Sequence, residues 1–290
     1  EEIFKPLFPE GKKSGRPNAS IRILVAMSVL KEGFGCSDED LFEKCEFDLL
    51  TRKALGMELL TDVTPSIDTY YLFRRRICEY QERTGIDLMQ LCFEQLAGKH
   101  VHLLKISGKC VRMDSKLIGS NIARQSRYEL IHTTLVKFLK TCTLTHLSPE
   151  QEERAKEYLK EDSSKTVYRS DSDTLQSNLA RIGNFIMEML AVFPATSPAH
   201  NLLQRLFDEQ YVVMDGKAVL RDKKEVKADS LQNPNDPDAT YRSKNDQKVQ
   251  GYVTNITETV EEGKPNIITS VQVETAVFAD CHFLQEAVEN

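Results

Sequence analysis

Apolar residues recur at helical spacing over residues 1–100, and polar stretches between them divide this region into separate helices. The expected helices run from Ile21 to about Lys31, from Ser37 onward, over 64–85 and over 87–98. In this scheme the "GFG" at 33–35 ends the first helix, Pro65 occupies the first turn of the third, and Gly98 ends the fourth. The pattern predicts an all-α domain over residues 1–100.

The hydrophobic period changes to two after about residue 101. The stretch "GKCVRMDSKL" (108–117) is typical of a β-strand, with Cys110, Arg112 and Asp114 on one side and Val111 and Met113 on the other. We expect the apolar alternation to end at Asp114, so that a carboxylate terminates the strand.

Helical patterns return over 121–210, and the proline-containing stretch 230–240 is a loop by composition. Two β-rich runs at 248–260 and 265–277 then indicate a hairpin. Asp280 stands at the N-cap position of one more helix. The resulting fold class is mixed α+β: an N-terminal all-α domain (1–100), then an incomplete mixed β-sheet domain (101–118 and 245–290) interrupted by a mainly helical insertion (119–244).

Composition is that of a globular protein large enough for two domains, with 40% hydrophobic and 28% charged residues in 290. No apolar run is long enough to span a bilayer, so no membrane association is expected. The seven cysteines include no CxxC pair, and His100/His102 have strand-like spacing. Free thiols in a reducing cytoplasm are therefore favoured over disulfides or zinc.

The net charge of −6 argues against nucleic-acid binding unless positive charge is concentrated locally. Three clusters of basic residues could do this. They are Lys12, Lys13 and Arg16; Arg74, Arg75 and Arg76; and Arg242, Lys244 and Lys248. In the alternative interpretation the clusters are solvated faces, and the three arginines pair with the nearby Asp68 and Glu79. Gly251, after the last cluster, would permit a close approach of backbone or ligand.

Asp114 has two interpretations. A carboxylate held by a central strand can bind a divalent cation, whereas many strands end in Asp simply to begin a turn. Taken alone, the spacing favours the turn. Asp215 is read as a hairpin turn because Gly216 follows it, and Asp280 as a helix cap, so neither is assigned a catalytic role.

Four stretches in this order together resemble bacterial insertion-sequence transposases of the DDE type. They are "GRPNASIRILVAMSVLKEGFGCSDEDLFEKCEFDLLTRKALG" (15–56), "TPSIDTYYLFRRRI" (64–77), "VRMDSKLIGSNIA" (111–123) and "DPDATYRSKNDQKVQGYVTNITET" (236–259).

The resemblance implies a helical DNA-binding domain followed by a ribonuclease-H-like domain that cuts and joins DNA at inverted repeats. It implies that Asp114 is the first of three catalytic acids and a ligand of Mg²⁺ or Mn²⁺, the metal being expected only with the complete triad. The three basic clusters become candidate DNA contacts. The implied partners are double-stranded DNA and further copies of the chain, in the bacterial cytoplasm at the nucleoid.

One departure accompanies the resemblance. The family's second Asp and its Glu would follow Asn290, so we expect a C-terminally truncated fragment that binds DNA without cleaving it. The main alternative is a non-catalytic transposase remnant that binds DNA or oligomerises. A third hypothesis, an unrelated metal-dependent nuclease, requires its other acids within 1–290 beside Asp114.

Overall fold

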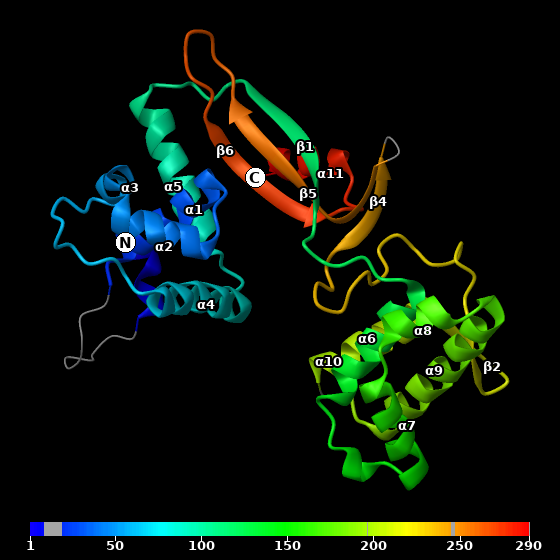
Figure 1. Ribbon diagram of the computed structural model, residues 1–290. Coiled ribbons are helices and arrows are strands. Elements are labelled where there is room, and N and C mark those ends of the chain that lie inside the picture. The colour runs from blue at the N-terminus through cyan, green and yellow to red at the C-terminus, as the bar shows by residue number, and fades with distance from the viewer. Residues whose placement is uncertain (9–18, 196, 245–246, 290) are drawn as a thin grey trace. The chain divides into compact units, whose positions relative to one another are not determined.

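The computed structural model describes residues 1–8, 19–195, 197–244 and 247–289, without the side chains of 286–289. The chain divides into two compact units (Figure 1). Unit 1 comprises Glu1–Lys109 with Val260–Thr269, and unit 2 comprises Cys110–Thr259 with the residues from Ser270 onward.

Unit 1 is built from helices, as the hydrophobic pattern predicts. They are η1 (Glu2–Leu7), α1 (Ile21–Phe34), α2 (Asp38–Phe47), α3 (Leu49–Ala54), α4 (Ile67–Thr84) and α5 (Leu88–Leu103). Ser37 caps α2 through a capping box with Asp40, and Gly35 ends α1 in the left-handed conformation with φ 61°. Both helix boundaries follow from local sequence.

Two other predicted boundaries are wrong. Pro65 lies ahead of α4, whose N-cap is Ser66, and not in its first turn. The last helix continues through Gly98 to Leu103, which also places His100 and His102 on a helix instead of a strand. A glycine inside a helix costs only about 1 kcal/mol relative to alanine, which the burial of neighbouring Ala97 helps to offset.

The core of unit 1 is apolar and joins all its helices except α3. It contains Phe4, Leu7, Leu24, Met27, Leu41, Cys45, Leu55, Met57, Tyr70, Phe73, Ile77 and Leu88. The rings of Phe4 and Phe73 lie 5.7 Å apart, which fixes η1 against α4.

A buried arginine organises the connection between α3 and α4. The Arg52 side chain is 6% exposed and donates four hydrogen bonds to backbone carbonyls. The acceptors are Cys45 at 3.1 Å, Leu59 at 2.9 Å, Leu60 at 3.4 Å and Asp62 at 2.9 Å. Because these carbonyls belong to an irregular segment and a helix end, the guanidinium replaces the partners that regular structure would supply.

The sheet of unit 2 is formed around one long central strand (Figure 1). Its strands are β1 (Val111–Gly119), β4 (Thr240–Lys244), β5 (Gln247–Thr259) and β6 (Ile268–Thr275), followed by α11 (Asp280–Glu289). β5 pairs antiparallel with β1 and with β4, and β6 also pairs with β5. The predicted hairpin is confirmed as β5 and β6, whereas β4 was not predicted.

Gly251 lies where the pairings of β5 meet, opposite both Gly119 and Thr240. Its φ is 156°, and a Cβ there would meet the Ile118 carbonyl oxygen and would lie 2.5 Å from the Ser120 nitrogen. The predicted close approach is therefore confirmed, and what approaches Gly251 is the backbone of the β1 end.

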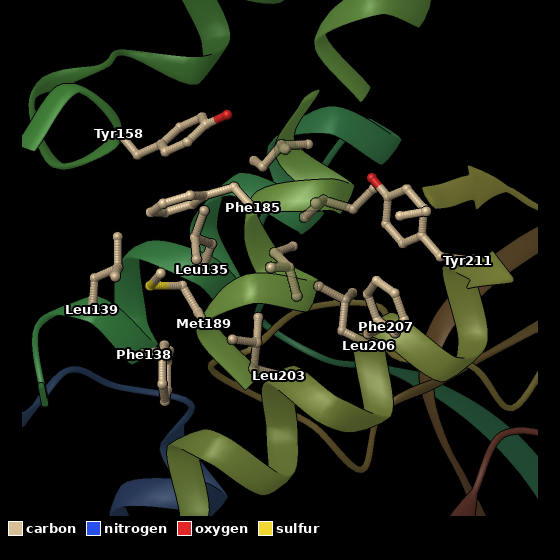
Figure 2. Packing of buried hydrophobic residues seen from close by; sticks show 14 of the residues in the cluster. Leu135, Phe138, Leu139, Tyr158, Phe185, Met189, Leu203, Leu206, Phe207 and Tyr211 are labelled. Atoms are coloured by element: carbon tan, nitrogen blue, oxygen red, sulfur yellow. The ribbon is translucent and has the colours of Figure 1, made fainter. Parts of the chain in front are cut away.

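The remainder of unit 2 is a helical body. It contains α6 (Arg127–Leu139), η2 (Leu144–His146), α7 (Pro149–Lys160), α8 (Ser163–Arg169), α9 (Ser172–Val192), α10 (Pro198–Gln210), β2 (Tyr211–Met214) and β3 (Lys217–Leu220). Figure 2 shows its core, in which Phe185 lies beneath Tyr158 and Phe207 lies beside Tyr211. Asp215, with φ 49°, forms the tight turn between β2 and β3 as predicted.

The loop that leads from β3 to β4 is held by Arg205 of this body and by hydroxyl groups near the end of β1. Arg205 donates to the carbonyls of Pro237 at 2.8 Å and Asp229 at 3.0 Å. Asp236 in the same loop accepts hydrogen bonds from Ser120 and Tyr252. These contacts attach the helical body to the end of the sheet where β1 finishes.

Candidate nucleic-acid interface and the Asp114 strand

Asp114 lies in the middle of β1, not at its end. The strand continues to Gly119 because every residue from Val111 to Gly119 pairs with β5. Asp114 is opposite Ile256 and exposed, while Met113 on the other face is half-buried. The predicted alternation is confirmed, but the prediction that this carboxylate terminates the strand is wrong.

The neighbours of Asp114 on its face of the sheet carry mostly positive charge. Arg112 and Lys116 flank it two residues away in either direction, at the side-chain period of a strand. An acid also lies near by register, since Glu258 is opposite Arg112, but Arg112 binds that carboxylate through Nε at 2.7 Å and through Nη2. Glu258 is thus engaged, and sequence spacing gave no sign of this contact.

The donor set around Asp114 does not fit a two-metal site. Across the described residues, no group of three or more His, Cys, Asp or Glu side chains is placed to hold a metal ion. One carboxylate flanked by two cations provides neither the ligands nor the charge that Mg²⁺ or Mn²⁺ requires. These residues alone therefore support no metal-dependent step.

The third basic cluster is divided between the two faces of the sheet. Along β5, residues 248, 254 and 256 point to one side and 247, 249 and 253 to the other. The register places Lys248 on the Asp114 face, whereas Arg242 opposite Val249 and Lys244 opposite Gln247 are on the reverse face. The pleat does not bring the three cations together.

Arg242 and Lys244 border a cavity of about 300 Å³ on the reverse face. Asp280, the first residue of α11, lies 3.9 Å from the Arg242 guanidinium and 3.7 Å from the Lys244 ammonium. Arg242 also donates to the carbonyls of Ala276 at 3.3 Å and Phe278 at 3.0 Å. Arg242 therefore anchors the turn before α11. Asp280 is the first residue of this helix, whereas the sequence predicted it to be the N-cap, the position before the first residue.

In unit 1 the arginines of α4 differ in their surroundings. Arg74 lies 3.8 Å from Asp38 of α2 and stacks on the Tyr70 ring at 5.7 Å. In the described part of the chain it pairs with this carboxylate, not with Asp68 or Glu79 as the alternative interpretation expected. The partner was missed because it is distant in sequence.

Asp38 is the centre of a small polar cluster. Tyr71 donates to it at 3.0 Å, and the Lys31 ammonium lies at 3.0 Å. Partial burial opposes ionisation, but the Lys31 and Tyr71 hydrogen bonds outweigh it and hold the pKa of the Asp38 carboxyl below its usual value. Asp38 is thus an anion that reduces the positive potential at one end of the arginine cluster.

Arg75 and Arg76 complete the cluster. Arg76 is half-buried and stacks on the Phe8 ring at 5.2 Å, beside a cavity of about 360 Å³ that Ser20 and Ser66 also line. Arg75 is exposed and, within the residues that the structure describes, makes no ion pair, hydrogen bond or ring contact. Lys12, Lys13 and Arg16 lie outside the described residues.

Comparison with known proteins gives one match. Residues 1–76 match the model of a family described as Transposase domain (DUF772). The match covers η1, α1, α2, α3 and the part of α4 that carries Arg74–Arg76. No curated protein and no solved structure matches the chain. The match supports a transposase function in general, and so a DNA-processing enzyme. Over the described ranges, no helix combines the length and apolar character needed to cross a bilayer.

Proposed function

We propose that the chain acts in DNA transposition and that unit 1 is its DNA-binding part. The observation that carries this proposal is the match of residues 1–76 to a transposase domain, because it includes the part of α4 that presents Arg74, Arg75 and Arg76. Clustered arginines on one helix are suited to phosphate contacts, which supply most of the affinity of non-specific DNA binding.

Within this cluster Arg75 is the principal phosphate contact. Its charge is exposed, whereas Arg74 shares Asp38 with Lys31. Lys12, Lys13 and Arg16 are proposed to add to this interface. Double-stranded DNA at the ends of the element is the proposed ligand.

We further propose that unit 2 begins a ribonuclease-H-like domain with Asp114 as the first acid of a DDE triad. The strand order supports this proposal, since an acid-bearing strand lies beside a hairpin that is followed by a helix. Lys248 shares the face of Asp114, and we propose that it contacts the DNA phosphate backbone there. Arg242 and Lys244 are not proposed as DNA contacts, because they lie on the reverse face and are paired with Asp280.

Binding to DNA is tested with a 30-bp mixed-sequence duplex by fluorescence anisotropy at several salt concentrations. We expect affinity to fall steeply with salt, and Arg75→Ala to reduce the slope of log K against log salt by about 1, the value for one lost phosphate contact. Arg83→Ala is the control, because Arg83 lies on the same helix but is stacked on Tyr80 and outside the matched residues. Absence of binding at low salt, or equal slopes for all three proteins, contradicts the proposal.

Cleavage distinguishes the proposal from the nuclease hypothesis. Residues 1–290 are expected to bind DNA without cutting it in the presence of Mg²⁺ or Mn²⁺, because the described residues contain no group of three or more His, Cys, Asp or Glu side chains placed to hold a metal ion. Metal-dependent strand cleavage that Asp114→Asn abolishes would favour an independent nuclease. Binding without cleavage is also what a transposase remnant would show, and that function stays the alternative.

A further inference from the structure

The end of α5 and the segment that follows it carry basic residues outside the three clusters named above. No Asp or Glu occurs from Gln95 to Met113, although the whole chain has 44 acidic residues against 38 Lys and Arg. The exposed basic residues of this segment all belong to unit 1 and form a fourth basic cluster. They are Lys99, His100, His102, Lys105 and Lys109.

The lysines of this cluster are not neutralised by ion pairs. Within the residues that the structure describes, none of the three forms one, unlike Arg74, Arg242 and Lys244. Folding brings the connection 260–267 close, where Glu261 accepts a hydrogen bond from the Ser107 N–H at 2.6 Å. Because this connection carries two acids and one lysine, it offsets only one of the three lysine charges.

Lys105 has a backbone conformation that suits glycine. Its φ is 53°, in the left-handed region. Its N–H bonds the His102 carbonyl at 3.1 Å, and the Ile106 N–H bonds the Val101 carbonyl at 3.0 Å, which is the Schellman arrangement that ends α5. Glycine is the usual residue here because it lacks the Cβ that opposes a positive φ. A lysine at this position costs stability, and residues in such conformations concentrate at functional sites.

The backbone that carries the cluster is held in place. Ile106 is 8% exposed, and the residues on either side of it are tied to the connection 260–267. Besides the Ser107 contact, the Lys264 ammonium donates to the Leu104 carbonyl at 2.9 Å. The charges therefore project from an ordered turn, which reduces the entropy lost when they bind a ligand.

The helix dipole is an alternative explanation for cations near a helix C-terminus. It accounts for His100 and His102, which lie in the last turn of α5. It does not account for Lys109, which lies beyond the helix, because the dipole effect falls off within the last turn.

We propose that the fourth basic cluster is a second phosphate-contact surface of unit 1 and that its ligand is the backbone of double-stranded DNA. Lysine ammonium groups bind phosphate as point charges, so the cluster adds affinity without reading base sequence. The inference rests on the proposed function for the identity of the ligand. Its residues are separate from the α4 arginines and lie outside the matched residues 1–76.

One variant tests binding and folding in opposite directions. Lys105→Gly removes a charge and also relieves the left-handed strain. In fluorescence anisotropy with the 30-bp duplex, the slope of log K against log salt is expected to fall by about 1, the value for one lost phosphate contact. The midpoint of thermal unfolding is expected to rise by about 2 °C. Loss of binding through damage to the fold would lower this midpoint instead.

Two further variants change the charge of the surface in opposite senses. Adding Lys99→Ala and Lys109→Ala to Lys105→Gly is expected to lower the slope by about 3 in total. Glu261→Gln removes an acid but keeps an oxygen that can accept the Ser107 N–H, and it is expected to raise affinity about twofold at 100 mM salt.

Lys140→Ala is the matched control, because Lys140 is an exposed lysine at the end of another helix, α6. Suppose that the wild-type chain binds with a slope that depends on Arg75, while Lys105→Gly and the triple variant give the same slope as Lys140→Ala. That result would overturn this inference and leave the proposed function standing. Absence of wild-type binding at low salt would overturn both.

Discussion

The four-carbonyl contact of Arg52 allows a quantitative prediction about unit 1. Replacement of Arg52 by methionine keeps the length and apolar stem of the side chain and removes every donor. The carbonyls of Leu59 and Leu60 belong to residues that are 64% and 83% exposed, so water can replace their partner. Cys45 is fully buried, and its carbonyl has less access to water.

Hydrogen bonds from a charged donor contribute about 1.5–3 kcal/mol each, and re-solvation recovers part of that. With two or three effective bonds, Arg52→Met is expected to lower the free energy of unfolding by about 2–4 kcal/mol. Arg52→Lys is expected to lower the free energy of unfolding by a similar amount, because a single ammonium group cannot reach all the carbonyls that the two guanidinium nitrogens contact.

The assay is urea unfolding followed by far-UV circular dichroism, with hydrogen exchange measured by mass spectrometry on peptides covering 55–63. Lys53→Met is the matched control: the neighbouring residue is an exposed cation, and its loss should change stability by less than about 0.5 kcal/mol. If Arg52→Met and Lys53→Met give equal stabilities and equal exchange in this segment, Arg52 does not organise it.

Further predictions concern the helical body and α1. Gly183→Ala is expected to destabilise the protein by about 1–3 kcal/mol, because the new Cβ would overlap the buried Tyr211 ring. Gly33→Ala, in α1 with open space around the new Cβ, should stabilise it by about 0.5–1 kcal/mol. Thermal melts that rank the two variants in the reverse order would contradict this packing. His200→Leu is expected to stabilise by about 1–2 kcal/mol in urea unfolding, since neither buried ring nitrogen has a hydrogen-bond partner among the described residues. His132→Leu should destabilise, because its Nε2 bonds the Tyr158 carbonyl at 3.0 Å. Burial lowers the pKa of His132 from its ordinary 6.5, so the unfolded chain binds the proton more readily and stability should fall as pH drops through 6.5. His132→Gln should flatten this part of the stability profile, and an unchanged slope would exclude His132 as its source.

Local sequence was sufficient wherever a structure depends on neighbouring residues. The Ser37 cap, the Asp215–Gly216 turn and the β5–β6 hairpin follow from residues within a few positions of one another. Gly251 was also identified correctly as a point of close approach, since glycine in a strand allows backbone contact.

The errors arose where distant pairing or burial decides the boundary. Apolar alternation weakens after Met113, yet β1 continues to Gly119 because β5 pairs with every residue of it. β4 has no clear strand pattern of its own and exists through its register with β5. Tertiary pairing outweighs weak local preference in both strands.

Residue patterns alone are enough to predict the helices of unit 1, the hairpin and the clusters of basic residues. Which of those charges are available depends on contacts that form on folding. Arg74 is paired with Asp38, and Arg242 and Lys244 are paired with Asp280, whereas Arg75 is exposed. The reason is physical: ion pairs form between groups that folding brings within a few ångströms, and no short sequence period encodes those contacts.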